Sequence, residues 1–370
     1  MSLLMFVSLP VQITAETKDN GEVKVKSSIL MCMNTGDIII EDNAYEHVSP
    51  ASVTKIMSLL IILEAIDSGK IALDDMVAAS ENAVSKGGSQ IWLEVGEKMS
   101  VNDLLKAVII ASANDACTLL GEYVAGSDAA FVDMMNDKVK ELGLKNSHFE
   151  NSTGLDDEIT NHYSCAYDLA VMATQVMKHD LIKKYSTVWL DSLRNGETEL
   201  NNTNKLVNTY NGITGLKTGT TSLAGFCLCA TAEREGLRLV SVVLGADTSD
   251  ARFTKSTQLL DYGFANYKVA ELSLDESKLS AVRVKNGIVK EVTPSVKSSG
   301  EILIAKNAAD FEYEYKIAKE VKAPVKQGDS LGEIIVKCDG KQISKIPLKS
   351  EKNIDKVSFR YIFIHLLKNI

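Results

Sequence analysis

Three short motifs contain the residue types that a serine nucleophile and its general base require. They are Ser52-Val53-Thr54-Lys55, Ser112-Ala113-Asn114 and Lys217-Thr218-Gly219. A hydroxyl is a weak nucleophile at neutral pH unless a neighbouring base removes its proton. Because residues three apart lie on the same face of a helix, one turn would supply both Ser52 and Lys55. The spacing therefore predicts covalent catalysis by a serine.

The first motif must lie at the start of a helix. Ser49 is a capping residue type, Pro50 suits the first helical position, and apolar residues follow at helical spacing as far as Ser68-Gly69. This predicts Ser52 in the first turn, where backbone N–H groups lack helical partners. The N–H group of Ser52 could then face an oxyanion.

The second motif follows an amphipathic stretch, VNDLLKAVII, and precedes another, DACTLLGEYVAG. Ser100 can cap the first stretch, with Asp103 three residues later. The pattern predicts two helices, with Ser112 and Asn114 at the junction between them.

The third motif is expected to open a pair of strands, AGFCLCATA and LRLVSVVLG, which Glu233–Gly236 would join as a hairpin. Lys217 at a strand edge would place positive charge opposite the nucleophile. Gly219 would let a substrate backbone approach closely.

Together the motifs resemble those of the serine-type D-alanyl-D-alanine carboxypeptidases, which are low-molecular-mass penicillin-binding proteins. The resemblance includes PASVTKIM, SANDACTLLGEYVAGS, NSTGLDDEITNHYSCAYDLA, NTNKLVNTYNGITGLKTGTT and KAPVKQGDSLGEIIVKCDGK, and covers the chain from about Ser27 to its end. It implies an enzyme that removes the terminal D-Ala from peptidoglycan stem pentapeptides and is acylated by β-lactam antibiotics. It implies neither a cofactor nor a metal ion.

The resemblance also implies catalytic roles. Ser52 would be the acylated nucleophile and Lys55 its general base. Ser112 would relay a proton to the leaving amine, and Asn114 would bind the substrate amide. The backbone N–H groups of Ser52 and Thr220 would form the oxyanion hole.

Substrate binding is implied for the residues around the third motif. Lys217 would give electrostatic support beside Gly219, and Thr218 and Thr220 would face the terminal carboxylate of the substrate. Arg252 resembles a family arginine near that carboxylate. Many family members have a histidine where this chain has Thr220, so a backbone donor is retained there but an imidazole is not.

Two other functions remain open. A serine β-lactamase would suit the string Glu197-Thr198-Glu199-Leu200-Asn201, but it lies 83 residues after Asn114 and only 20 before Lys217. In class A enzymes such a string lies roughly midway between the two motifs, so a chance match is favoured here. The second alternative is a penicillin-binding wall protein with little hydrolytic turnover.

Composition narrows the partners and the number of domains. A formal net charge of −9 argues against nucleic acid. With 370 residues, two domains are expected. The six cysteines show no disulfide or zinc spacing and are expected to be small apolar fillers. His47, close before Ser52, is expected to be a loop or surface residue.

The expected fold class is α+β. A β-lactamase/DD-peptidase-like catalytic domain over residues 16–268 would combine an antiparallel sheet, a helical subdomain and a helix from about Asp250 to Asn266. A hairpin is expected at Asn34-Thr35-Gly36. Alternating apolar and polar residues predict a small all-β domain over 269–356.

Both ends of the chain predict a location outside the cytoplasm. Residues 1–15 look like a secretory signal or its remnant, although no lysine or arginine precedes the apolar run. Residues 357–370 predict an amphipathic helix, too short to span a bilayer, that lies on a membrane surface. We therefore expect an exported protein at the extracytoplasmic face of the bacterial cytoplasmic membrane.

Overall fold

The computed structural model describes residues 23–156, 160–296 and 300–359. Contacts divide the chain between Lys268 and Val269 into two units, each with its own buried apolar residues. The first unit combines helices with an antiparallel sheet, and the described part of the second consists of strands and one 3-10 turn. The prediction of an α+β domain followed by an all-β domain is therefore confirmed.

A five-stranded sheet forms the centre of the first unit, in the order β2-β1-β9-β8-β7. All neighbouring strands are antiparallel. The strands are β1 (Ser27–Cys32), β2 (Ile38–Asp42), β7 (Ile213–Thr221), β8 (Gly225–Arg234) and β9 (Leu237–Ala246). Both predicted hairpins are confirmed. At the β8–β9 turn, Glu235 and Gly236 have φ values of 50° and 80°, as a type I′ turn requires.

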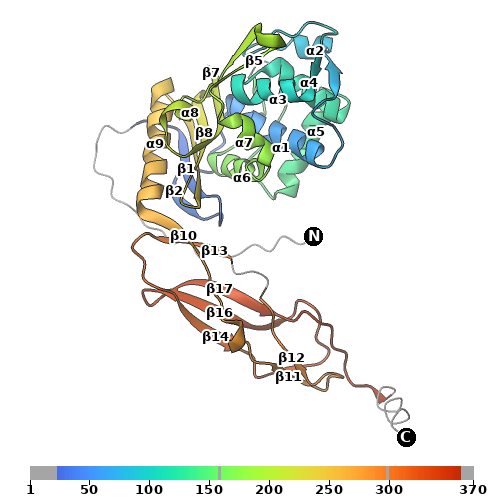
Figure 1. Cartoon of the computed structure of the whole chain (residues 1–370), viewed down its shortest axis with the longest axis vertical. Coiled ribbons are helices and arrows are strands. Elements are labelled where there is room, and N and C mark those ends of the chain that lie inside the picture. The colour runs from blue at the N-terminus through green and yellow to red at the C-terminus, as the bar shows by residue number, and fades with distance from the viewer. Residues whose placement is uncertain (1–22, 157–159, 297–299, 360–370) are drawn as a thin grey trace. The chain divides into compact units, whose positions relative to one another are not determined.

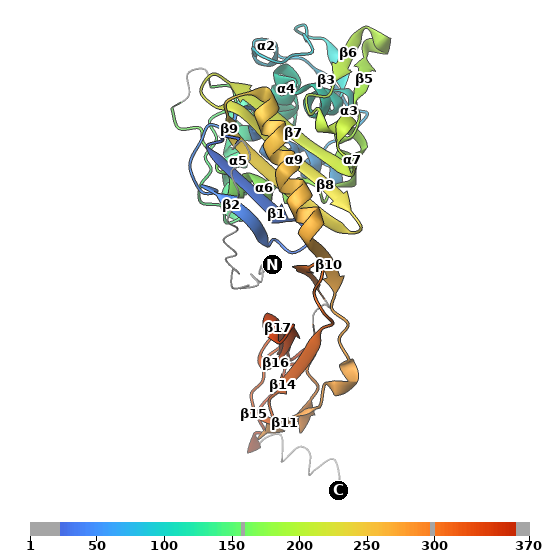
Figure 2. The ribbon, with the colours of Figure 1, turned by 90° about the vertical axis from the view of Figure 1, so that its left-hand side faces the viewer.

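Helices cover both faces of this sheet (Figures 1 and 2). Helix α9 (Ser249–Asn266) packs against β8 and β9, and α6 (Ala166–Val176) packs against β1 and β9 from the other side. Helix α1 (Lys55–Asp67) packs on α6 and buries ten of its thirteen residues. The helix expected from about Asp250 to Asn266 is therefore present. Because α1 is largely buried and begins at Lys55, the end of the first motif lies inside the protein.

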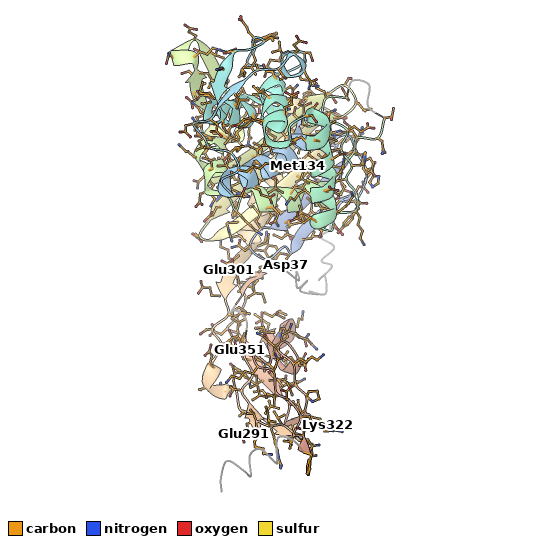
Figure 3. The ribbon with its side chains drawn as sticks, turned by 90° about the vertical axis from the view of Figure 1, so that its right-hand side faces the viewer. Asp37, Met134, Glu291, Glu301, Lys322 and Glu351 are labelled. Carbon is orange, nitrogen blue, oxygen red and sulfur yellow. The ribbon has the colours of Figure 1, made fainter. Side chains whose placement is uncertain are left out.

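The remaining elements of the first unit form its helical region. They are η1 (Ala51–Thr54), β3 (Met76–Ala78), α2 (Glu81–Val84), β4 (Lys98–Ser100), α3 (Val101–Lys106), η2 (Ala107–Ala111), α4 (Asn114–Ala125), α5 (Asp128–Glu141), α7 (Asp180–Ser186), β5 (Leu190–Leu193), η3 (Arg194–Gly196), β6 (Thr198–Asn201) and α8 (Leu206–Thr209). Met134 on α5, labelled in Figure 3, packs at the edge of the apolar core.

The junction predicted at the second motif is confirmed. The side chain of Ser100 accepts a hydrogen bond from the Asp103 N–H group and caps α3. The chain then passes through the π-helical turn η2 to Ser112, which has φ 63° and ψ 27°. Helix α4 begins at Asn114. The left-handed conformation of Ser112 separates the two helices.

The strands after α9 form three small sheets. They pair β10 (Tyr267–Glu271) with β13 (Glu301–Ala305), β11 (Val282–Lys285) with β12 (Glu291–Val292) and β15 (Glu320–Lys322), and β16 (Ser330–Cys338) with β14 (Glu312–Ile317) and β17 (Lys341–Lys349). The 3-10 turn is η4 (Glu276–Lys278). Glu291 and Lys322, labelled in Figure 3, lie on the two outer strands of the β12-β11-β15 sheet.

Within the described ranges, no helix has the length and apolar character needed to cross a bilayer. The predicted signal segment, 1–15, lies outside the described residues. So do residues 360–370 of the predicted surface helix. All six cysteines are buried, as expected of apolar fillers.

Two local predictions are wrong. Ser49 does not cap the first helix, because the chain begins that element with a 3-10 turn and the buried Ser49 hydroxyl has no hydrogen-bond partner within the described structure. The third motif does not open the β8–β9 pair. Lys217, Thr218 and Gly219 lie within a strand of their own, β7, which is an outer strand of the sheet.

Candidate active site

The nucleophile turn, residues 50–55, carries the first motif. Ser52 lies in η1, and Lys55 is the first residue of α1. Ala51 has φ 48°, an uncommon conformation for a residue with a Cβ atom, and it redirects the chain just before Ser52. The Lys55 Nζ atom lies 2.9 Å from Ser52 Oγ. The turn thus brings the predicted pair into hydrogen-bond contact.

The Lys55 amine is buried and has three oxygen partners. It lies 2.9 Å from Ser52 Oγ, 2.5 Å from Asn114 Oδ1 and 2.9 Å from the Thr153 carbonyl oxygen. The side chain has no exposed surface. Burial lowers the pKa of Lys55 to about 8, against a smaller opposing effect of the thiol of Cys117 and the carboxylate of Asp115.

The partners of Lys55 suit a general base. A protonated amine can donate to all three oxygens, whereas a neutral amine has two N–H groups and one lone pair. The amide oxygen of Asn114 and the carbonyl oxygen of Thr153 can only accept. In the neutral amine both N–H groups are therefore directed to these acceptors, and the lone pair is directed to the hydroxyl of Ser52.

Asn114 is held by the loop that precedes β4. Its amide Nδ2 donates to the Gly87 carbonyl at 2.7 Å, and its backbone N–H group donates to the Ser89 carbonyl at 2.7 Å. Gly88 between them has φ 74°, and a Cβ atom there would lie 2.8 Å from Asn114 Nδ2. The amide is thus oriented with Oδ1 toward Lys55.

A loop whose role the sequence analysis missed supplies the Thr153 carbonyl. Asn151 organises this loop, since its Oδ1 accepts from the backbone N–H groups of Thr153 and Gly154. A Cβ atom on Gly154, which has φ 81°, would lie 1.8 Å from the carbonyl oxygen of Ala51. The string Asn151-Ser152-Thr153-Gly154 is a turn-type sequence, which is the signal that could have identified it.

Strand β7 packs against the nucleophile turn at Gly219. A Cβ atom on Gly219 would lie 2.8 Å from the Pro50 carbonyl oxygen and 3.0 Å from the Ser52 backbone nitrogen. The glycine predicted for close approach therefore serves the contact between strand and turn. This contact brings the third motif beside Ser52.

Lys217 is a second buried amine in the site. Its Nζ donates to the carbonyl oxygen of Thr218 at 3.0 Å, and its side chain is almost fully buried. Burial and the positive charges of Lys55 and Arg252 hold the pKa of Lys217 well below its usual range. An anionic ligand group beside Lys217 would supply the missing counter-charge.

Arg252 on α9 reaches the same end of β7. Its Nη1 donates to the Gly219 carbonyl and to Thr220 Oγ1, both at 3.0 Å, and to the Cys227 carbonyl at 3.2 Å. The Thr218 hydroxyl donates to Thr203 Oγ1 at 2.7 Å. Arginine and two threonines thus converge on one end of the site, where the resemblance implied a carboxylate.

Ser112 lies between two helices that also hold the site. Its side chain is buried, with 3% of the residue exposed, two positions before Asn114. The three motifs are brought together by the hydrogen bond between Lys55 and Asn114 and by the close approach of Gly219 to Pro50 and Ser52. The four predicted catalytic residues and the five predicted binding residues belong to this region.

Other candidate residues have different surroundings. His47 is exposed, bonds to Asn146 and stacks on Tyr163, as expected of a surface residue. His162 is buried behind the nucleophile turn, with Nε2 2.8 Å from Thr54 Oγ1, and burial lowers its pKa to about 4. Glu197 precedes β6 and is absent from the described hydrogen bonds of Ser52 and Lys55.

Comparison with known families gives two matches. Residues 12–248 match the D-alanyl-D-alanine carboxypeptidase family, Peptidase_S11. Residues 267–356 match the C-terminal domain of penicillin-binding protein 5.

Individual relatives are similar to this chain over most of its length. The D-alanyl-D-alanine carboxypeptidase DacF of Bacillus subtilis is 40% identical over 341 residues, which cover 91% of this chain and 87% of DacF. Penicillin-binding protein 5 of Haemophilus influenzae has a similar structure, with a TM-score of 0.82 and 30% identity over 92% of this chain and 100% of that chain. Penicillin-binding protein D2 of Listeria monocytogenes, solved in an ampicillin-bound form, has a TM-score of 0.58 and 29% identity over 67% of this chain and all of its own.

Proposed function

Since the chain belongs to the Peptidase_S11 family of D-alanyl-D-alanine carboxypeptidases, we propose that Ser52 attacks the bond between the two terminal D-alanines and carries the acyl intermediate. The enzyme is a peptidoglycan hydrolase of the carboxypeptidase type. The contact of Lys55 Nζ with Ser52 Oγ, in a buried site with two further fixed acceptors, carries the proposal.

Acylation begins with the neutral amine of Lys55. With a pKa of about 8, about a tenth of the amines are neutral at pH 7, against fewer than about one in a thousand for an ordinary lysine. The amine takes the hydroxyl proton as Ser52 Oγ bonds to the carbonyl carbon. The backbone N–H groups of Ser52 and Thr220 stabilise the oxyanion.

Collapse of the tetrahedral intermediate breaks the C–N bond and releases D-alanine. The proton taken by Lys55 is passed through the hydroxyl of Ser112 to the leaving amine, so proton transfer is balanced. Asn114 donates to the amide carbonyl of the substrate through Nδ2. Water then hydrolyses the ester on Ser52 and regenerates the enzyme.

The terminal carboxylate binds at the end of β7. Thr218 and Thr220 offer hydroxyls there, Arg252 holds Thr220 Oγ1, and Lys217 supplies positive charge once an anion is present. β-Lactam antibiotics carry a carboxylate next to a reactive amide. They therefore acylate Ser52 through the same contacts.

Mass spectrometry and product release test this assignment. Penicillin should add one adduct, on Ser52, and a stem pentapeptide ending in D-Ala-D-Ala should release D-alanine steadily. Ser52→Ala should abolish both. An adduct on another side chain, or D-alanine release by Ser52→Ala, would contradict the assignment.

The same experiment separates the two alternative functions. Nitrocefin turnover faster than D-alanine release would indicate a β-lactamase. Stoichiometric penicillin labelling without peptide hydrolysis would indicate a binding protein. The family match and the relatives favour neither.

We also propose that the enzyme is exported and held on the outer face of the cytoplasmic membrane. Its substrate class lies outside the cytoplasm, and the sequence of residues 357–370 has an amphipathic pattern. Cell fractionation of the full chain and of a chain ending at Lys356 tests this. The full chain should be in the membrane fraction and the shortened chain should not, and equal membrane content would contradict the anchor.

A further inference from the structure

Trp92 is a large apolar side chain held in solvent. The residue is 73% exposed and has φ 57°, a left-handed conformation that tryptophan rarely adopts. It lies in the loop of residues 87–97. This loop begins with the Gly87 and Ser89 carbonyls that hold Asn114, and it ends where β4 begins. A strained backbone beside a catalytic site is a reason to look for a function.

The carboxylate of Asp115 fixes the loop from the inside. Its two oxygens accept from the Ile91 N–H group at 3.2 and 3.1 Å, and Oδ2 accepts from the Leu93 N–H group at 3.2 Å. Asp115 is fully buried and follows Asn114 directly. The residues on both sides of Trp92 are therefore fastened to α4.

The guanidinium of Arg194 fixes the carbonyl side of the same loop. Its Nη1 donates to the Ile91 carbonyl at 2.9 Å and its Nη2 to the Trp92 carbonyl at 3.5 Å. Two further bonds, of 2.7 and 3.0 Å, join it to the carboxylate of Glu97. Asp115 and Arg194 thus make seven hydrogen bonds, five to the backbone of residues 91–93 and two to Glu97 at the end of the loop. The indole of Trp92 stays exposed.

Chain length places Trp92 within reach of a bound substrate. Trp92 is three residues from Ser89, whose carbonyl accepts from Asn114, so the two Cα atoms lie at most about 11 Å apart. A stem pentapeptide has three residues before its terminal D-Ala-D-Ala, which extend about 10 Å from it. An extended peptide of this length is therefore about as long as the greatest possible distance between Ser89 and Trp92.

We propose that Trp92 binds the peptide segment that precedes the D-Ala-D-Ala unit, and so determines the preference for long stem peptides over short ones. A rigid indole loses little conformational entropy on binding, and tryptophan is enriched among residues that dominate binding energy. The inference rests on the proposed function, in which Asn114 binds the substrate amide.

Kinetics on two substrates test the proposal with the full chain. Trp92→Ala should lower kcat/KM for a stem pentapeptide about tenfold, mainly through KM, because it removes one aromatic contact. The same variant should leave kcat/KM for acetyl-D-Ala-D-Ala within about twofold of wild type. Trp92→Phe should retain most of the pentapeptide preference.

The matched control is Met76→Ala on β3, since Met76 is 58% exposed but lies outside the loop. Met76→Ala should leave kcat/KM unchanged for both substrates. An equal loss on both substrates would show that Trp92 only supports the fold of the site. No loss on either, or a loss confined to polymeric peptidoglycan, would also overturn the assignment to the peptide.

Fluorescence gives a direct reading of binding, because the chain has only two tryptophans. In Trp189→Phe/Ser52→Ala protein, pentapeptide should shift the emission of Trp92, and acetyl-D-Ala-D-Ala should not. An emission unchanged at saturating pentapeptide would refute the contact. Penicillin labelling of Ser52 in Trp92→Ala protein separates this inference from the proposed function, because labelling should persist whatever Trp92 does.

Discussion

At the scale of single residues, two buried amines share one site. Lys55 has oxygen partners on three sides, whereas the bond of Lys217 is to the adjacent carbonyl of its own strand. Burial lowers the pKa of each, and their mutual repulsion lowers that of Lys217 further. The site can therefore hold a neutral amine at Lys55. It can also bind an anionic group of a ligand beside the positive charge of Lys217.

The lowered pKa of Lys55 predicts the pH dependence of acylation. The neutral amine is the active form, so the second-order rate of penicillin labelling should rise about tenfold per unit below pH 7. It should level off above about pH 8, near the pKa of the free enzyme. Stopped-flow labelling with a fluorescent penicillin measures this, and a rate independent of pH from 6 to 9 would contradict it.

Lys55→Arg should slow acylation by about a hundredfold or more, since a guanidinium does not give up its proton near neutral pH. The positive charge remains, so the variant separates basicity from charge. Circular dichroism should show an intact fold. Labelling at the wild-type rate would rule out Lys55 as the base.

At the scale of elements, the site depends on how closely β7 approaches η1. Glycine at position 219 lets the strand lie against the backbone of Pro50 and Ser52. Glycine at position 154 does the same for the loop that holds Lys55, against Ala51. The nucleophile turn is thus fixed from two sides by residues without a side chain.

Gly219→Ala should therefore separate β7 from the turn. The new Cβ atom would lie 2.8 Å from a backbone oxygen, so strand or turn must shift. We expect penicillin labelling to slow by at least about tenfold, because small misplacements of reacting groups are costly. Gly300→Ala is the control, since nothing lies within 4 Å of its Cβ position, and equal effects of the two changes would argue against a local cause.

At the scale of the whole molecule, each unit has its own apolar core. The cluster of the first unit lies between residues 29 and 244, and two clusters of the second lie between residues 272 and 354. The proposed catalytic residues all belong to the first unit. Its chemistry should therefore not depend on the second.

A chain ending at Lys268 should fold and label with penicillin within about threefold of the full-length rate, because a unit with its own core can fold alone. Thermal unfolding followed by circular dichroism should show one cooperative transition. A shortened chain that unfolds without cooperativity would show that the first unit needs the second for stability. Ser52→Ala in the shortened chain serves as the labelling control.

The sequence by itself determined the features that depend on short-range patterns. The spacing of Ser52 and Lys55, the cap at Ser100, the helix junction at Ser112 and the two hairpins follow from helical periodicity and from capping and turn-forming residues. The family resemblance added the roles of Asn114 and Lys217. The prediction that Ser49 caps the helix failed at short range, because Ala51 adopts a left-handed conformation against Gly154, about a hundred residues away.

Only the tertiary structure decided how the base is tuned. The partners of Lys55 at Asn114 and Thr153 lie 59 and 98 residues away, and the Gly87 carbonyl that orients Asn114 comes from yet another loop. Hydrogen bonds between such distant segments exist only after the chain has closed these loops, and no local pattern encodes their geometry. Burial of the amine, which lowers its pKa, likewise arises only when helices and sheet pack around it.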